Sequence, residues 1–238
     1  QFKSNFAVIF RAYNDGVAYR IATSFKDPIT VVDETATFNF IRGAHAWAPV
    51  IQKRPDLDVY HTSFEELYPY RLLDSFSKND FMYSPVLLNT VDNMKVAITE
   101  SDLDDYPGMF LKGTGSNALN GVFAPWPNQE KVVEGDYPQK VVTERAEYIA
   151  KTKGTRNFPW RVMLIARADK ELPTNDLVYR LASPTKVKDA SWIHPGKCTD
   201  EWIIDVNLFN VPFVSGVNTA SYKYYIDFAK DRKSTRLN

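Results

Sequence analysis

The sequence predicts a mainly β protein, with a β-sandwich over residues 1–190 and the opening strand and helix of an α/β unit over residues 191–230. Short runs rich in β-branched and aromatic residues, separated by turn signals, fill most of the first part. The apolar run Val162–Ile165 is continuous, as in a strand that is buried on both faces. After Ala190 a turn-rich loop, an apolar run and a helical repeat follow in order.

The first expected elements form a hairpin. The runs Phe6–Arg11 and Val17–Thr23 flank the turn signal Asn14-Asp15-Gly16, and large apolar residues alternate with small or polar ones in the second run. The segment Phe64–Ser75 is expected to be irregular, because Pro69 interrupts its near-helical spacing. Composition predicts further strands at Ile29–Asp33, Thr37–Ile41, Pro85–Leu88, Lys95–Thr99, Phe110–Gly113 and Lys140–Val142.

Apolar runs close the expected sandwich and open the next unit. Arg161–Ala166 and Leu177–Leu181 are both predicted to be buried sandwich strands. Trp202–Val206 is predicted to be an apolar strand, and Ser221–Lys230 a helix with apolar residues at helical spacing. Asn218 or its neighbour Thr219 is available as the helix N-cap.

Composition limits the function classes. Of the 238 residues 44% are hydrophobic and 24% charged, with 29 basic and 29 acidic side chains, so a soluble globular protein is expected. A net charge of zero provides no field that would attract a nucleic-acid backbone, and we expect no nucleic-acid partner. No apolar run reaches the roughly 20 residues of a membrane-spanning helix. Cys198 stands alone, which excludes an intrachain disulfide, and it is expected to be a small buried residue.

The segment Ala97–Leu111 is the first candidate for chemistry. It carries Glu100, Asp102, Asp104 and Asp105 between an apolar strand and a Pro-Gly turn. Carboxylates at a strand end, where backbone carbonyls are also free, are the oxygen ligands that calcium prefers. The spacing does not fit an EF-hand loop, so further ligands would have to come from elsewhere. The alternative is a solvated acidic turn, and the spacing leaves both open.

Other motifs are sparse. The sequence has no nucleophile elbow, phosphate loop or dinucleotide fingerprint, which gives no support to a serine hydrolase, kinase or dehydrogenase. The histidines show no metal-ligand spacing, and they are His45, His61 and His194. The tryptophans are either core residues or platforms on which a sugar ring stacks, and they are Trp47, Trp126, Trp160, Trp192 and Trp202.

Four segments, in order, resemble glycoside hydrolase family 97. They are F-A-V-I-F-R-A-Y-N-D-G-V-A-Y-R from Phe6, T-E-S-D-L-D-D-Y-P-G-M from Thr99, S-W-I-H-P-G-K from Ser191, and V-S-G-V-N-T-A-S-Y-K-Y-Y-I-D-F-A over Val214–Ala229. The resemblance covers nearly the whole chain. It implies a galactose-mutarotase-like super-sandwich to about Ala190, followed by the first strand and helix of a catalytic (β/α)₈ barrel.

The resemblance also implies an activity. Family members are calcium-dependent enzymes that remove terminal α-linked glucose or galactose from oligosaccharides, by an inverting or a retaining route, and the periplasm is the implied location. In the family a glutamate of the N-terminal domain joins barrel glutamates around the calcium, and the matching position here is Glu100. The catalytic carboxylates belong to later barrel strands, so this chain is expected to contain none of them. The alternative is a non-catalytic carbohydrate-binding or mutarotase-like sandwich.

Residues 231–238 depart from the family. They read D-R-K-S-T-R-L-N, which matches one reading frame of a common sequencing-adapter DNA. We therefore expect this tail to be non-native, and a natural basic tail is the alternative.

Overall fold

The computed structural model describes residues 5–53, 58–134, 138–196, 198–201, 206–231 and 236–237. The chain divides into two compact units, residues 1–133 with 139–183, and residues 134–138 with 184–238. The first unit contains stacked β-sheets, and the second contains a helix and a short two-stranded sheet. The predicted boundary near Ala190 stays a prediction.

The larger sheet of the first unit has the strand order β1-β2-β16-β9-β8-β5-β6, with β15 paired to the end of β2. Neighbouring strands are antiparallel, and Tyr13 lies opposite Gly16, so a two-residue loop joins β1 to β2 as the turn signal predicted. The strands are β1 (Phe6–Tyr13), β2 (Gly16–Ser24), β5 (His45–Trp47), β6 (Tyr70–Leu72), β8 (Val86–Asn89), β9 (Lys95–Ser101), β15 (Thr155–Asn157) and β16 (Trp160–Ala166).

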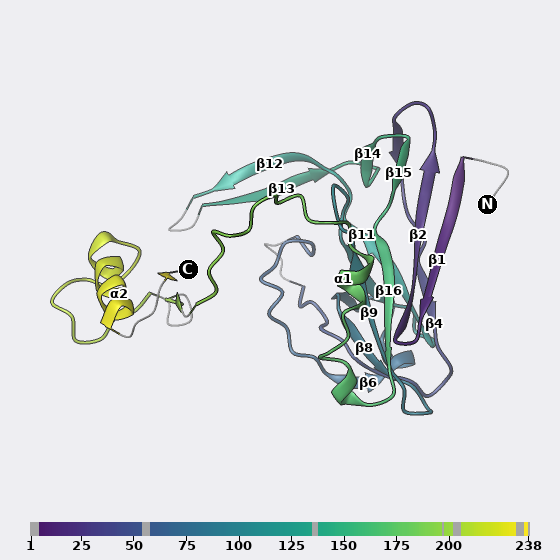
Figure 1. The fold of residues 1–238 in the computed structure, drawn as a ribbon, viewed down its shortest axis with the longest axis horizontal. Helices are drawn as coiled ribbons and strands as arrows, with labels where there is room; N and C mark the ends of the chain where they lie inside the picture. The colour runs from purple at the N-terminus through teal and green to yellow at the C-terminus, as the bar shows by residue number, and fades with distance from the viewer. Residues whose placement is uncertain are drawn as a thin grey trace. The chain divides into compact units, whose positions relative to one another are not determined.

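A smaller sheet packs against one face of the larger one (Figure 1). Its order is β4 (Thr37–Asn39), β11 (Ala118–Phe123), β10 (Met109–Gly113) and β7 (Phe81–Tyr83). Leu88 and Ile98 of the larger sheet share one fully buried cluster with Leu111 and Leu119 of the smaller sheet. Burying the apolar face of each sheet against the other is the arrangement of a β-sandwich, which confirms the predicted mainly β architecture.

Two short pairings complete the first unit. β3 (Ile29–Val31) pairs with β14 (Ala150–Thr152), and β12 (Pro127–Val133) forms a hairpin with β13 (Gln139–Arg145). The predicted irregular segment from Phe64 is indeed irregular as far as Pro69, after which β6 and a 3₁₀ turn (Leu73–Ser75) follow. A second 3₁₀ turn, Asp169–Glu171, follows β16. The sequence-based predictions missed β5, β6, β7, β11, β12, β14 and β15 of the first unit, and the irregular prediction is wrong over β6.

The run Leu177–Leu181 is the helix α1, so the predicted buried strand is wrong. Leu177 and Leu181 are four residues apart and both buried, which is the spacing of one helix face. The side-chain oxygen of Asn175 accepts a hydrogen bond from the Leu177 amide at 3.0 Å and so satisfies a free amide at the helix start. α1 packs against Trp160 and Val162 of β16, on the face of the larger sheet opposite the smaller sheet.

The second unit contains the predicted helix. α2 spans Thr219–Asp231, and the Asn218 side-chain oxygen accepts a hydrogen bond from the Ser221 amide at 3.0 Å, which identifies Asn218 as the cap. Residues 202–205 of the predicted strand Trp202–Val206 lie outside the described residues. The start of a barrel therefore stays a prediction.

The remaining pairing of the second unit is parallel. β17 (Cys198–Thr199) pairs with β18 (Arg236–Leu237). Cys198 is exposed, which corrects the expected burial, because its strand is two residues long and not part of the sandwich core. The adapter origin of residues 231–238 stays a prediction. Among the helices that the structure describes, none is long and apolar enough to cross a membrane.

Candidate functional site

Arg161 organises a buried polar cluster between the sheets of the sandwich. It lies on β16, directly opposite Glu100 of β9 in the antiparallel register. The guanidinium donates from Nε to Glu34 Oε1 at 2.8 Å, from Nη2 to Glu34 Oε2 at 2.7 Å, and from Nη1 to Glu100 Oε1. Arg161 is 1% exposed, so these charge-assisted hydrogen bonds are shielded from water.

The cluster has more carboxylates than cations. Burial raises the pKa of Glu100, and the charge of Arg161 together with a hydrogen bond from the Met109 amide to Oε2 (2.7 Å) opposes that rise. Tyr106 donates its hydroxyl hydrogen to Glu34 Oε2 at 3.1 Å. Burial, and then the charge of Glu34, raise the pKa of Tyr106 well above its ordinary value, so its hydroxyl stays protonated. One guanidinium thus binds two carboxylates that are largely buried.

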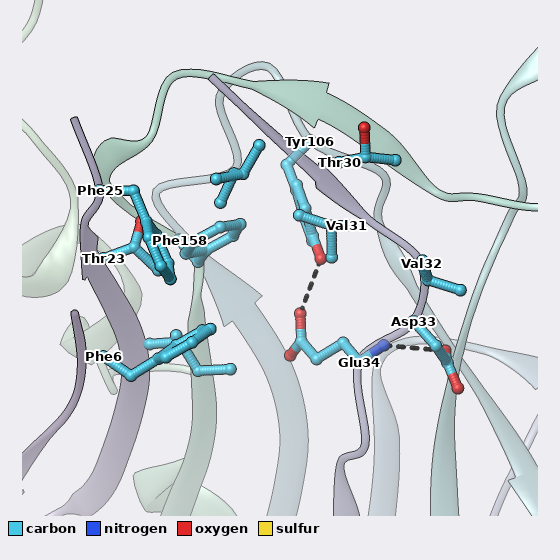
Figure 2. Close-up of a pocket in the computed structure, with 12 residues that line it drawn as sticks. Phe6, Thr23, Phe25, Thr30, Val31, Val32, Asp33, Glu34, Tyr106 and Phe158 are labelled. Carbon is cyan, nitrogen blue, oxygen red and sulfur yellow. Dashed lines mark hydrogen bonds between the residues drawn. The ribbon is translucent and has the colours of Figure 1, made fainter. Parts of the chain in front are cut away.

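An aromatic hollow of about 310 Å³ adjoins this cluster. Figure 2 shows Tyr106 reaching down to Glu34, with Phe6, Phe25 and Phe158 along the other side. Both Glu34 oxygens are already hydrogen-bonded to Arg161, and one also to Tyr106. The hollow therefore presents mainly apolar surface, and the charge of Glu34 is paired with that of Arg161.

The acidic run after Glu100 is held by basic side chains from other strands. Asp102 accepts hydrogen bonds from Arg20 Nη1 at 3.2 Å and from the Ser183 amide at 2.8 Å. The backbone carbonyls of Asp104 and Asp105 each accept one from Arg156 at 3.2 Å. This loop lines a polar hollow of about 500 Å³. The residues of the predicted calcium segment are thus brought beside arginines as well as beside one another.

These contacts bear on the calcium that the family resemblance implies. Calcium takes six to eight oxygen ligands. Over the described ranges, no group of three or more His, Cys, Asp or Glu residues is placed to hold a metal ion. Both Glu100 oxygens are engaged, one by Arg161 and one by the Met109 amide. The described residues do not form a calcium site by themselves, and Glu100 as a calcium ligand stays a prediction.

The predicted aromatic platforms separate into buried and exposed groups. Trp160 is fully buried, with the Arg20 guanidinium 4.3 Å from its ring centroid, so it is a core residue. Trp47 stacks on Tyr70 at 4.1 Å. Trp126 and Trp192 are exposed, and Trp202 lies outside the described residues.

The histidines take no metal-binding arrangement in the part of the chain that the structure describes. His45 stacks on Tyr70 at 4.9 Å, and its Nδ1 lies 3.1 Å from the Gly43 carbonyl oxygen. Sequence reasoning missed Glu34 and Arg161 as site residues. Only a charged residue inside an apolar run, as at Arg161, could have indicated a buried ion pair.

Comparison with known proteins identifies the family. The model of the glycosyl-hydrolase 97 N-terminal domain matches residues 1–184. A retaining alpha-galactosidase from Bacteroides thetaiotaomicron is 41% identical over 235 residues, which are 96% of this chain and 35% of that protein. The chain thus spans about a third of the length of this relative.

Solved structures agree with the fold. A glycoside hydrolase family 97 enzyme from Pseudoalteromonas sp. strain K8, in complex with acarbose, matches with a TM-score of 0.73 at 22% identity, over 98% of this chain and 32% of that one. A beta-arabinopyranosidase matches with a TM-score of 0.68 at 17% identity, over 98% and 35%. At these sequence identities the solved structures support the fold alone, and the family model shows the family. The chain belongs to glycoside hydrolase family 97, with its N-terminal domain over residues 1–184.

Proposed function

We propose that this chain is the N-terminal part of a glycoside hydrolase that releases terminal α-linked galactose from oligosaccharides. The observation that carries the proposal is the 41% identity, over 96% of the chain, to a retaining alpha-galactosidase. α-Linked glucose is the second candidate, because the enzyme from Pseudoalteromonas sp. strain K8 was solved with acarbose and also with panose. The 22% identity of that enzyme is the reason why galactose comes first.

In this proposal the sandwich supports the reaction and does not perform it. A retaining glycosidase needs one carboxylic acid to protonate the leaving oxygen and one carboxylate to attack the sugar. Glu34 and Glu100 are the carboxylates of the buried cluster, and Arg161 binds both. A carboxylate held in this way is not available as an acid or a nucleophile. The family resemblance implies that the catalytic pair comes from residues beyond these 238, and the calcium dependence and the periplasmic location implied by the family belong to the same proposal.

The test uses the full-length enzyme and paired substrates. It is assayed with p-nitrophenyl α-galactoside and α-glucoside, with added calcium and after a chelator. Faster cleavage of the galactoside, lost with the chelator and restored by calcium, supports the proposal. Faster cleavage of the glucoside would favour terminal α-linked glucose, the second candidate substrate. Cleavage of neither substrate would contradict the proposal. Equal activity with and without the chelator would contradict the proposed calcium dependence.

Glu100→Gln separates a ligand from a structural residue. If Glu100 binds calcium, the variant needs more calcium for half-maximal activity. If Glu100 stays bound to Arg161 and does not bind calcium, the calcium requirement is unchanged and only the stability of the sandwich changes. Signal-sequence analysis of the full gene, followed by cell fractionation, tests the location.

A further inference from the structure

A small hollow beside Trp126 combines an exposed aromatic ring with polar side chains. It has a volume of about 250 Å³, and its walls come from the segments 105–107, 124–127 and 149–151, together with Arg145. The side chain of Trp126 is one of these walls, and the residue is 49% exposed. The hollow lies entirely within the first unit of the chain.

The backbone of Trp126 is fixed before any ligand arrives. Its amide donates to the Tyr148 carbonyl at 2.8 Å, and its own carbonyl accepts from the Ala146 amide at 2.8 Å. Pro125 and Pro127 flank it and restrict the backbone dihedrals on both sides. Because the backbone is already fixed, ligand binding would cost little backbone conformational entropy at Trp126.

The charged residues Asp105 and Lys151 line the same hollow. Asp105 has a φ of 52°, and Arg156 holds its backbone carbonyl at 3.2 Å, so the turn that carries its carboxylate is fixed. The ammonium of Lys151 lies 4.7 Å from the centroid of the Tyr148 ring. Within the described ranges, neither Asp105 nor Lys151 forms an ion pair that would occupy its charge.

The hollow continues into a larger one. Asp105 and Lys151 also line the polar hollow of about 500 Å³, which Thr152 and Asn157 share. The smaller space lies below the range of about 300–1,000 Å³ that is usual for drug-sized ligands, so it suits one ring, and the adjoining space gives room for a second.

This arrangement matches the chemistry of a neutral saccharide. The C–H face of a pyranose is apolar and packs on an aromatic ring, while its edge carries hydroxyls that both donate and accept. A carboxylate accepts from two adjacent hydroxyls, and an ammonium donates to a third. We propose that Trp126, Asp105 and Lys151 form a binding site for a neutral oligosaccharide, with one sugar ring stacked on Trp126. The choice of a galactose-containing oligosaccharide as the ligand rests on the proposed function.

The test is saturation-transfer NMR of this chain titrated with melibiose, a disaccharide with an α-linked galactose. Trp126→Ala is expected to weaken binding at least tenfold, and Trp126→Phe, which keeps an aromatic face, by less. Trp192→Ala is the matched control, because Trp192 is 65% exposed and lines no part of this hollow. Asp105→Asn is expected to weaken binding without changing the circular dichroism spectrum.

The results distinguish four outcomes. Loss of binding in Trp126→Ala, with retention in Trp192→Ala, supports the site. Equal binding by Trp126→Ala and the unaltered chain overturns it, and so does an unaltered chain that gives no melibiose signal at any concentration tested. Failure of the full-length enzyme to cleave α-galactosides, with Trp126-dependent binding intact, would reject the proposed function and leave this site standing.

Discussion

Replacing Arg161 with Met is the sharpest test of the buried cluster. Methionine is similar in length and apolar, so the variant removes the cation without opening a large cavity. It leaves Glu34 and Glu100 without a cation in a largely buried site, since Arg161 is 1% exposed and makes hydrogen bonds to both. Breaking a buried pair by removal of one partner costs about 3–5 kcal/mol, because the remaining charge is uncompensated. We expect a loss of that size in the free energy of unfolding at pH 8.

The loss should shrink in acid. Without Arg161, the pKa of Glu100 rises further, because burial then acts unopposed by the positive charge. Protonation removes the uncompensated charge, and each bound proton recovers up to about 1.4 kcal/mol per pH unit below the raised pKa. The difference between Arg161→Met and the unaltered chain should therefore be smaller at pH 5 than at pH 8.

Glu100→Gln supplies the control for this pH dependence. The pKa of Glu100 in the folded chain is above its ordinary value, so its contribution to stability is greatest at low pH and falls as pH rises from the ordinary glutamate range through the raised pKa. The neutral amide removes that contribution and keeps an acceptor for the Met109 amide. Urea denaturation at several pH values measures all three proteins. A loss below about 1 kcal/mol for Arg161→Met at pH 8 would refute the reasoning.

The remaining predictions concern packing and exposure. Leu177→Ala should lower the free energy of unfolding by about 2–5 kcal/mol, because the side chain is fully buried, while Tyr179→Ala on the same helix, 81% exposed, should stay within about 0.5 kcal/mol in the same urea titration. Gly16→Ala should cost about 1–3 kcal/mol, since the added methyl would lie 2.5 Å from Leu177 Cδ2 and 2.6 Å from the Met163 carbonyl oxygen, and its melting temperature would be the readout. Cys198 should react fully with Ellman's reagent in the folded chain, and protection until denaturant is added would contradict its exposure.

The sequence predicted the fold where local pattern and global packing agree. The turn Asn14-Asp15-Gly16 and the alternation after it predicted the β1–β2 hairpin. Helical spacing, with Asn218 or Thr219 as the cap, predicted α2, and the structure shows that Asn218 is the cap. The error at Leu177–Leu181 arose because an apolar run of five residues fits a buried strand and a short helix equally well. Strands of three residues, such as β5, are too short to show a period, and their neighbours in the sheet define them.

The candidate site was predictable only in part, because its partners are distant in sequence. The acidic run was visible, but Arg20 lies 82 residues from Asp102, and Arg161 lies 61 residues from Glu100. Glu34 is 127 residues from Arg161 and had no local signal. Spacing along the chain therefore identified a set of carboxylates and could not identify the guanidinium groups that hold them. The antiparallel register of β9 and β16 supplies that information.

Two carboxylates of the same acidic run illustrate how position decides role. Glu100 lies on β9, where the sheet register places it opposite Arg161 and burial commits it to the cluster. Asp105 lies past the strand end in a left-handed conformation, exposed at the edge of the hollow beside Trp126. Asp105 is exposed to a sugar hydroxyl, whereas Glu100 is bound by Arg161 and by the Met109 amide. Saccharide binding by this run should therefore depend on Asp105, and the integrity of the sandwich on Glu100.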